Sequence, residues 1–405
     1  MATVKPFRAL RPPREKADSV ACVPYDVVTD DEVREITAAN PNSFLRVTRP
    51  EAEFGTDSPQ LAFAEAKKLL EQYIADGLLV QDAEPAVYIY RLTDGDHQQT
   101  GVVACCAVDD YDSDVIKKHE KTRPDKVRDR TDHMLALRAQ TGLIFLAFRN
   151  TDEMRGLIQE TAATEPVYDF TCPKRVRQTV WRVAGGEAFV RAFERIPEIY
   201  VADGHHRAES ASLTRKELRD SNPNHTGDED YNFVMAGMFP AEDLAIMAYN
   251  RVVRDLNVMS EEEYFDRLRE YFIITETDER QPKDRGQYAM YLGGRWYNLR
   301  YNVNYIREPD ALQRLDVQVL QQNVLGPILG IGDPRTDKRI HFVGGGRGID
   351  ELEQLVDEGG YAVAFSLFPT TMDDLFAVSD MGEIMPPKST WFEPKLKDGL
   401  FIHRI

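Results

Sequence analysis

The sequence predicts a mixed α/β protein, of the α/β or α+β class. Short apolar runs that suit buried strands alternate along the chain with amphipathic stretches at helical spacing. The chain has 405 residues, more than one ordinary core holds, so we expect two or three domains. No run approaches the roughly 18 uninterrupted apolar residues of a membrane span. Because "MATVKPFRALRPP" also lacks the apolar centre of a signal peptide, we expect a cytoplasmic protein with no membrane partner.

Residues 1–100 are expected to form an N-terminal α/β region. A helix capped by Thr29 or Asp30 follows a proline turn. The clearest amphipathic helix of the chain covers 58–78. The stretch "AVYIYRLTDGDHQQTGVVACCAV" predicts a hairpin that turns at Asp94-Gly95.

Residues 101–254 are expected to form a central core. A basic segment and a helix over 117–141 lead into the apolar run "LIFLAF". A strand that ends at Asp203 precedes a helix over 206–219, and "YNFVMAGMF" and "LAIMAYNRVV" indicate two further buried strands. Residues 255–405 begin with the helix "SEEEYFDRLREYF" and form a C-terminal α+β region.

Charge and cysteine content restrict the partners. The net charge is −18, a field that repels nucleic acid, so we expect no nucleic-acid partner and a local basic pocket for any anionic ligand. The four cysteines show no CxxC spacing, which favours reduced thiols and no structural zinc site. The vicinal pair Cys105-Cys106 lies in an apolar run and suits a packing role.

The first candidate site is "IYVADGHHRAESA", residues 199–211. An apolar strand ends at Asp203, Gly204 permits a tight turn, and helix formers follow. The free N–H groups of a first helical turn suit a phosphate, Arg207 suits a bidentate contact, and either histidine can transfer a proton. Asp203 would repel phosphate unless it holds a divalent cation or orients a histidine. The simpler alternative is an aspartate that caps a helix beside two satisfied histidines.

The second candidate is "KKHEKTRPDKVRDR", residues 117–130, where seven basic residues outnumber three acids. A charge run of this kind is also typical of a solvated helix face. Glu120 lies between His119 and Lys121, so its carboxylate stays ionised and is available as a general base beside a bound polyphosphate. The basic residues are Lys117, Lys118, Lys121, Arg123, Lys126, Arg128 and Arg130.

Three further segments carry weaker signals. In "MPPKST", Lys388, Ser389 and Thr390 suit phosphate contacts or a turn that anchors the last strand. The run "FVGGGRGIDELEQL" lacks both the GxGxxG spacing and a Walker lysine, which favours a flexible turn. Polar residues beside the N-terminal prolines either build those turns or line the same pocket from the other side. They are Arg8, Arg11, Tyr25, Asp26, Asn42 and Ser43.

The order of these motifs resembles the ParB/sulfiredoxin-like superfamily, and within it the free-serine kinases. The matching pieces are the "HE" pair at 119–120, a helix over 125–140, Gly142, a strand over 143–148, and "VADGHHRAESA". About fifty residues separate the two strands, which indicates an inserted segment in this core. The whole chain also resembles the domain of unknown function 1015 family. The stretches that carry this resemblance are "KPFRALRP", "PYDVV", "NPNSFLRV", "KHEKTRPDK", "ADGHHR", "VLGPILGI", "MPPKSTWFEPKL" and "GLFIHRI".

The resemblance implies phosphorylation of a small free amino acid, L-serine first, with Mg2+ and ATP or ADP. Glu120 would be the general base, assisted by His205, and Asp203 would bind the metal. Nucleotide and phosphate contacts would come from Gly204, His206, Arg207, Lys118, His119, Lys121, Arg123, Lys126, Lys388, Ser389 and Thr390. Substrate contacts would come from Arg8, Tyr25, Asn42 and Ser43. A phosphoserine phosphatase and a non-catalytic CTP- or ATP-binding switch are the alternatives, and a homodimer stays open.

This reading also predicts geometry. The strands over 143–148 and 199–202 should lie close together in one sheet. Glu120 should then face Asp203 and Arg207 across a single cleft, with the basic side chains of 118–130 pointing into it, because stabilising charge must act where negative charge develops.

Overall fold

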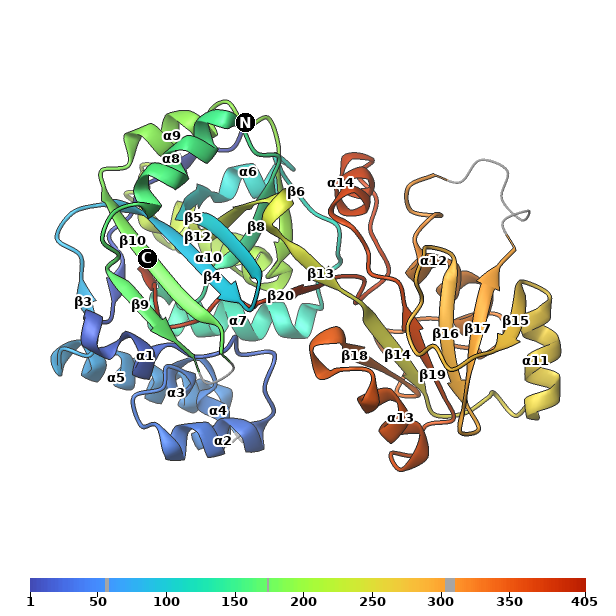
Figure 1. Ribbon diagram of the computed structural model, residues 1–405. Helices are drawn as coiled ribbons and strands as arrows, with labels where there is room; N and C mark the ends of the chain where they lie inside the picture. The colour runs from blue at the N-terminus through green and yellow to red at the C-terminus, as the bar shows by residue number, and fades with distance from the viewer. Residues whose placement is uncertain (55–57, 173–174, 303–309) are drawn as a thin grey trace. The chain divides into compact units, whose positions relative to one another are not determined.

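The computed structural model describes residues 1–54, 58–172, 175–302 and 310–405. Strands and helices alternate along the chain, which confirms the mixed α/β class. The chain folds into two compact units (Figure 1). The first unit comprises 1–118, 122–244 and 394–405, and the second comprises 245–393 with the three residues 119–121. Residues 394–405, the C-terminal strap, therefore return to the first unit.

A nine-stranded sheet forms the centre of the first unit, in the order β6-β11-β8-β12-β5-β4-β10-β9, with β1 paired to β5. The strands β8 and β11 are antiparallel neighbours, as the motif order predicts. The strands β4 and β5 form the expected hairpin, with Asp94 opposite His97. The bounds are β1 (Val4–Lys5), β4 (Ala86–Asp94), β5 (His97–Ala107), β6 (Ile116–Lys117), β8 (Ile144–Phe148), β9 (Tyr168–Thr171), β10 (Arg177–Ala184), β11 (Ile199–Asp203) and β12 (Phe233–Pro240). Short pairs join β2 (Leu10–Arg11) to β3 (Val80–Gln81) and β7 (Ala139–Gln140) to β21 (His403–Arg404).

Helices surround this sheet. A capping box begins the second helix, because the Thr29 side chain accepts the Glu32 N–H and the Glu32 carboxylate accepts the Thr29 N–H. Two long helices lie where the apolar spacing predicts them, at 59–75 and 205–221. The bounds are α1 (Ala17–Val20), α2 (Asp30–Ala39), α3 (Leu45–Thr48), α4 (Pro50–Phe54), α5 (Pro59–Ala75), α6 (Val108–Asp112), α7 (Pro124–Leu137), α8 (Asp152–Ala162), α9 (Glu187–Phe193) and α10 (His205–Ser221).

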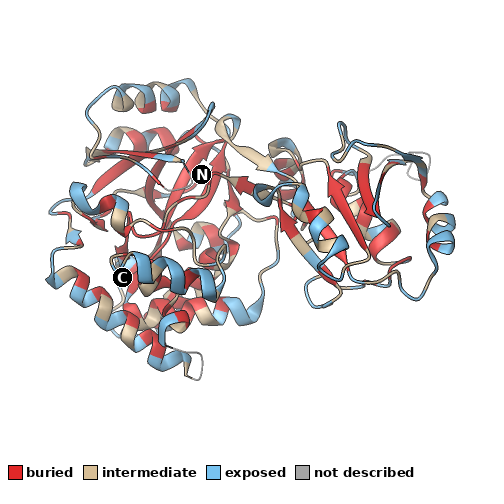
Figure 2. Ribbon diagram, turned by 60° about the horizontal axis from the view of Figure 1, so that its bottom comes forward, coloured by how far each residue is buried: buried red, intermediate tan, exposed pale blue. Residues whose placement is uncertain are grey.

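Different parts of the chain bury the two faces of the sheet. Side chains alternate along a strand, so Ile89 and Tyr88 point to opposite faces. The face of Ile89 packs against α8, α9 and α10. On the face of Tyr88, the strap places the Phe401 ring 5.1 Å from the tyrosine ring. Figure 2 shows the result: the strands are buried, and exposed residues follow the outward sides of the helices.

The unit boundaries differ from the three regions expected from sequence. Buried apolar residues between Leu10 and Leu79 form a cluster of their own with Leu137, Ala139 and Ile402, whereas β4 and β5 continue the sheet that holds β8, β11 and β12. The helix expected over 125–140 is α7, and in the basic segment before it β6 pairs with β11. The segment "LAIMAYNRVV" belongs to the second unit and forms β13 (Ala245–Met247) and β14 (Tyr249–Val253).

The second unit contains a six-stranded antiparallel sheet in the order β15-β17-β16-β19-β14-β18. Its other strands are β15 (Phe272–Glu276), β16 (Gln287–Leu292), β17 (Arg295–Tyr301), β18 (Ile340–Gly344) and β19 (Val363–Leu367), while β13 pairs with β20 (Trp391–Glu393). Its helices are α11 (Glu261–Arg269), α12 (Asp316–Leu320), α13 (Asp350–Asp357) and α14 (Met372–Asp380). Across the described parts of both units, no helix combines the length and the apolar character that crossing a membrane requires.

Candidate functional site

The junction between β11 and α10 holds the histidine turn. Asp203 is the last residue of β11, and α10 begins at His205. Gly204 between them has a φ of +86°, a left-handed conformation that glycine adopts without steric cost. The strand therefore ends and the helix begins within one residue, so the first turn of α10 lies at the carboxyl end of β11.

Arg207 does not point to solvent as a phosphate-binding residue would. Its guanidinium lies 2.7 Å from the Asp398 carboxylate of the strap, and the two side chains are only 10% and 3% exposed. Burial opposes the charge of the arginine, but the adjacent Asp398 raises the pKa of the guanidinium above its ordinary value. Arg207 thus forms a buried ion pair with the strap, and its expected direct contact with nucleotide phosphate stays a prediction.

Gly142 makes this ion pair sterically feasible. A Cβ at position 142 would lie 1.3 Å from a guanidinium nitrogen of Arg207 and 2.3 Å from a carboxylate oxygen of Asp398. Gly142, which lies between α7 and β8, therefore makes room for the side chain of Arg207, 65 positions further along the chain.

Asp203 contacts a second strap residue. Its Oδ2 lies 2.7 Å from Nζ of Lys395, and its Oδ1 accepts the backbone N–H of Gly204 at 2.7 Å. The Asp203 side chain is 40% exposed and the Lys395 side chain 14% exposed, so the pair lies at the mouth of the site. Lys395 and Asp398 were missed in the sequence. The only signal there was the run of charged residues in "EPKLKDG", within an otherwise apolar C-terminus.

A small pocket of about 40 Å3 lies beside these pairs. At this size it admits water molecules or one small ionic group, and a nucleoside would have to lie outside it. Of the described residues that line it, two are cationic and three are acidic, a net charge of −1. The lining residues are Pro24, Asp26, Val27, Leu143, Phe145, Asp203, Gly204, Arg207, Lys395, Leu396 and Asp398.

Tyr25 reaches the same region from the N-terminal part of the chain. Its ring lies 5.1 Å from the guanidinium of Arg207 and 4.3 Å from that of Arg130. Burial raises the pKa of the Tyr25 hydroxyl, so the ring stays neutral and offers both cations its π face. Of the four expected substrate residues, the structure places this one near the turn.

The other three lie elsewhere. The Arg8 side chain donates to the Asp82 carbonyl at 3.0 Å. Asn42 donates its backbone N–H to the Asn40 side chain, and the Ser43 hydroxyl accepts from the Leu45 N–H. Asn42 and Ser43 therefore build the turn before α3, and the expectation that all four line one pocket is wrong.

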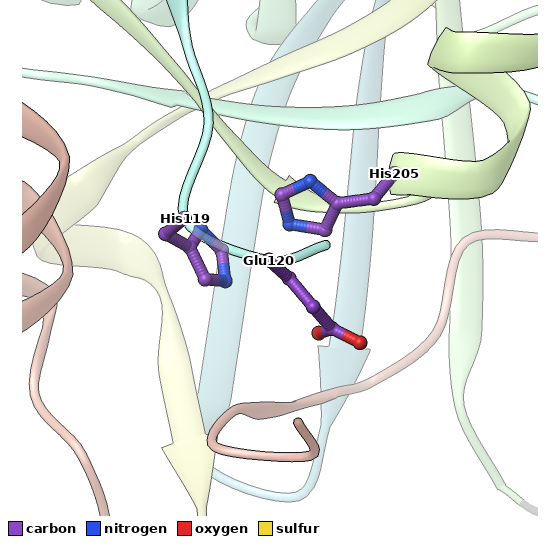
Figure 3. A group of neighbouring side chains, drawn as sticks. All are labelled: His119, Glu120 and His205. Carbon is purple, nitrogen blue, oxygen red and sulfur yellow. The ribbon is translucent and has the colours of Figure 1, made fainter. Parts of the chain in front are cut away.

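Glu120 lies close to the histidine turn. His119, Glu120 and His205 each offer one ligand atom, and these atoms all lie within 4.8 Å of one another. Figure 3 shows the two imidazole rings flanking the Glu120 side chain. Residues 119–121 belong to the second unit, whereas Lys118 before them and Thr122 after them belong to the first. Both histidines are buried and Glu120 is partly exposed.

The basic residues around Glu120 are mostly engaged in local contacts. Lys118 pairs with Asp114 at 3.0 Å, and Arg123 pairs with Asp125 at 2.8 Å. Lys121 and Lys126 are exposed. The expectation that this segment directs its charge into a cleft is therefore wrong for Lys118 and Arg123.

His206 has a structural contact of its own. Its Nε2 accepts the backbone N–H of Arg123 at 3.1 Å, which ties the start of α7 to the start of α10. The ring nitrogen that accepts this bond is the unprotonated one, so His206 is neutral in this arrangement.

The segment "MPPKST" belongs to the second unit. Lys388 has a left-handed φ of 59°, and its carbonyl accepts from buried Arg251 at 3.0 Å. The Ser389 hydroxyl donates to the Pro386 carbonyl at 2.6 Å. Thr390 Oγ1 lies 3.4 Å from Nε2 of His119. The backbone of this segment is thus fixed by polar contacts within its own unit, and its role in phosphate binding stays a prediction.

Several solved structures show low similarity to this chain. A free serine kinase mutant in complex with AMP is 14% identical, with a TM-score of 0.37, and the match covers 74% of this chain and 92% of that one. A conserved hypothetical protein from Pyrococcus furiosus is 13% identical, with a TM-score of 0.36 and coverage of 74% and 94%. SbnI with a C-terminal truncation, from Staphylococcus aureus, is 13% identical, with a TM-score of 0.38 and coverage of 73% and 85%.

No curated protein sequence matches the chain significantly. A family model described as "Protein of unknown function (DUF1015)" matches residues 4–318. That range includes the Glu120 segment, Gly142 and the histidine turn, and it ends before the strap. This chain belongs to the DUF1015 family.

Proposed function

We propose that this protein is a phosphotransferase that uses a magnesium-bound nucleotide to phosphorylate the hydroxyl of a small free amino acid, serine first. One observation carries the proposal: Glu120 lies beside His205 at the N-terminus of α10. A candidate base and a helix terminus suited to phosphate thus occur together. The resemblance of the "HE" and "DGHHR" motifs to those of the free-serine kinases supports the same chemistry.

In this mechanism Glu120 takes the proton of the substrate hydroxyl. The hydroxyl oxygen then forms a bond to the terminal phosphorus, the bond to the bridging oxygen breaks, and the nucleotide leaves with one phosphate fewer. The N–H groups of the first turn of α10 stabilise the phosphate oxygens. Arg207 acts indirectly, because its pairing with Asp398 holds α10 in place.

Magnesium is the cation that the resemblance implies, and the donor groups fit it. Carboxylate oxygens are the ligands that this ion prefers, usually one or two together with substrate phosphates. Asp203 would hold it at the pocket mouth, and its Oδ2 is the atom now bonded to Lys395. The bound ion would neutralise phosphate charge. The nearby imidazoles of His119 and His205 are nitrogen donors, which magnesium does not favour.

The decisive experiment follows phosphorus by NMR. Purified protein is incubated with Mg2+, ATP or ADP, and serine, and in parallel with phosphoserine alone. A phosphoserine signal that depends on serine and nucleotide supports the kinase. Release of phosphate from phosphoserine without nucleotide indicates a phosphatase instead. Nucleotide binding with no turnover of either substrate indicates a non-catalytic switch.

A further inference from the structure

We propose that Lys395 of the C-terminal strap is the phosphate-binding cation of this site and exchanges between Asp203 and the phosphate of the bound nucleotide. The inference rests on the proposed function, and it assigns a binding role to a residue outside the motifs that suggest that function.

The other candidate cations are engaged elsewhere. Arg207 is buried against Asp398, and its guanidinium fills the space that a side chain at Gly142 would need. Arg130 is 7% exposed and bonds the Asp129 carboxylate at 2.7 Å. Among the described residues that line the pocket, Lys395 is therefore the cation that lies at the pocket mouth, next to the N-terminus of α10.

The backbone around Lys395 is anchored, so only its side chain needs to move. The Pro394 carbonyl accepts from Gln99 at 3.1 Å, and the Lys397 N–H donates to the Tyr90 hydroxyl at 3.3 Å. The Asp398 N–H donates to the Cys22 carbonyl at 3.0 Å. A lysine on a fixed backbone has a flexible four-carbon stem, which suits a cation that moves between two anions.

Charge balance gives the exchange its direction. The pocket lining has a net charge of −1, which repels a bare phosphate. Asp203 would hold a divalent ion through Oδ2, so Nζ of Lys395 would give up that oxygen and the lining would become net positive. The Lys395 ammonium would then attract the phosphate. The Lys395–Asp203 pair would thus compete with the metal for the same oxygen.

Two calorimetric titrations test the inference, with Lys395→Met as the test variant and Lys397→Met as the matched control two residues away. Titration with MnCl2 alone probes Asp203, and titration with ADP in excess Mg2+ probes the phosphate contact. We expect K395M to bind Mn2+ more tightly than wild type, because its competitor is gone. We expect its ADP affinity to fall about ten-fold or more, the loss typical of one hydrogen bond between charged groups.

Lys395→Arg keeps a cation and is expected to retain ADP binding, which separates a lost charge from a disturbed strap. Circular dichroism melting checks that each variant is folded. Equal ADP affinity in K395M and K397M would overturn the inference even if turnover is intact. If the wild-type protein binds ADP but forms no phosphoserine, the kinase proposal is overturned instead. The role of Lys395 then depends only on the ADP affinities of K395M and K397M.

Discussion

Replacing Gly142 by alanine should destabilise the first unit by displacing one side chain of a buried ion pair. The new Cβ would lie 1.3 Å from a guanidinium nitrogen of Arg207 and 2.4 Å from its central carbon. Real Cβ atoms do not approach other atoms below about 3 Å, and the arginine side chain is only 10% exposed, so we expect the guanidinium to leave Asp398. Asp398, 3% exposed, then loses the partner of its charge.

Removing one partner of a buried ion pair costs about 3–5 kcal/mol. Burial already raises the pKa of the Asp398 carboxyl, and the loss of Arg207 should raise it further, so in G142A protonation of this group as pH falls should recover part of the loss. We therefore expect the free energy of unfolding to fall by about 3 kcal/mol at pH 8 and by less at pH 5.

Urea denaturation followed by circular dichroism measures this change. The matched control is Gly156→Ala, because Gly156 lies inside α8 and an added Cβ meets no atom within 4 Å. Alanine there should stabilise the helix by about 0.5–1 kcal/mol. A G142A protein whose stability lies within 1 kcal/mol of wild type at both pH values would refute the steric argument.

Three further predictions concern the site and the fold. Glu120→Gln should keep ADP affinity by calorimetry and lose about two to three orders of magnitude of phosphoserine formation, the usual contribution of a general base, whereas near-normal turnover removes Glu120 from the mechanism. Asp203→Asn should raise the Mg2+ concentration needed for half-maximal turnover, since an amide is a poorer ligand than a carboxylate, and an unchanged requirement places the metal elsewhere. Burial lowers the pKa of His133, whose Nε2 lies 2.8 Å from the Val47 carbonyl, to about 3. Between about pH 6.5 and 3 only the unfolded state binds this proton, so the free energy of unfolding should fall as pH falls, by about 1.4 kcal/mol per pH unit. Urea denaturation at several pH values measures this slope, and an equal slope in His133→Gln would contradict the prediction.

Local patterns in the sequence predicted local structure well. The apolar spacing that marks 58–78 and 206–219 gave α5 and α10, and the Asp94-Gly95 turn gave the β4–β5 hairpin. These features depend on neighbours a few residues apart, and periodicity reports on such neighbours. The pairing of β8 with β11 was predicted as well, because the motif order fixes it.

Long-range partners could not be predicted in the same way. Arg207 was assigned to phosphate because its neighbours suggested a binding turn, but its partner Asp398 lies 191 residues away. The boundaries of the three expected regions differ from those of the two units for the same reason. The strap follows the second unit in the sequence but belongs to the first unit. No local pattern indicates that a charged residue near the C-terminus will neutralise one in the middle of the chain.

The return of the strap has a consequence for biosynthesis. Domains usually fold one after another as a chain leaves the ribosome. Here the first unit cannot finish in that order, because its last pieces, residues 394–405, are translated after the whole of 245–393. Until then Arg207 has no Asp398, the sheet face beneath Phe401 is uncovered, and Asp203 lacks Lys395. A nascent chain therefore carries the motif residues before Lys395 and Asp398 have been made to pair with Asp203 and Arg207.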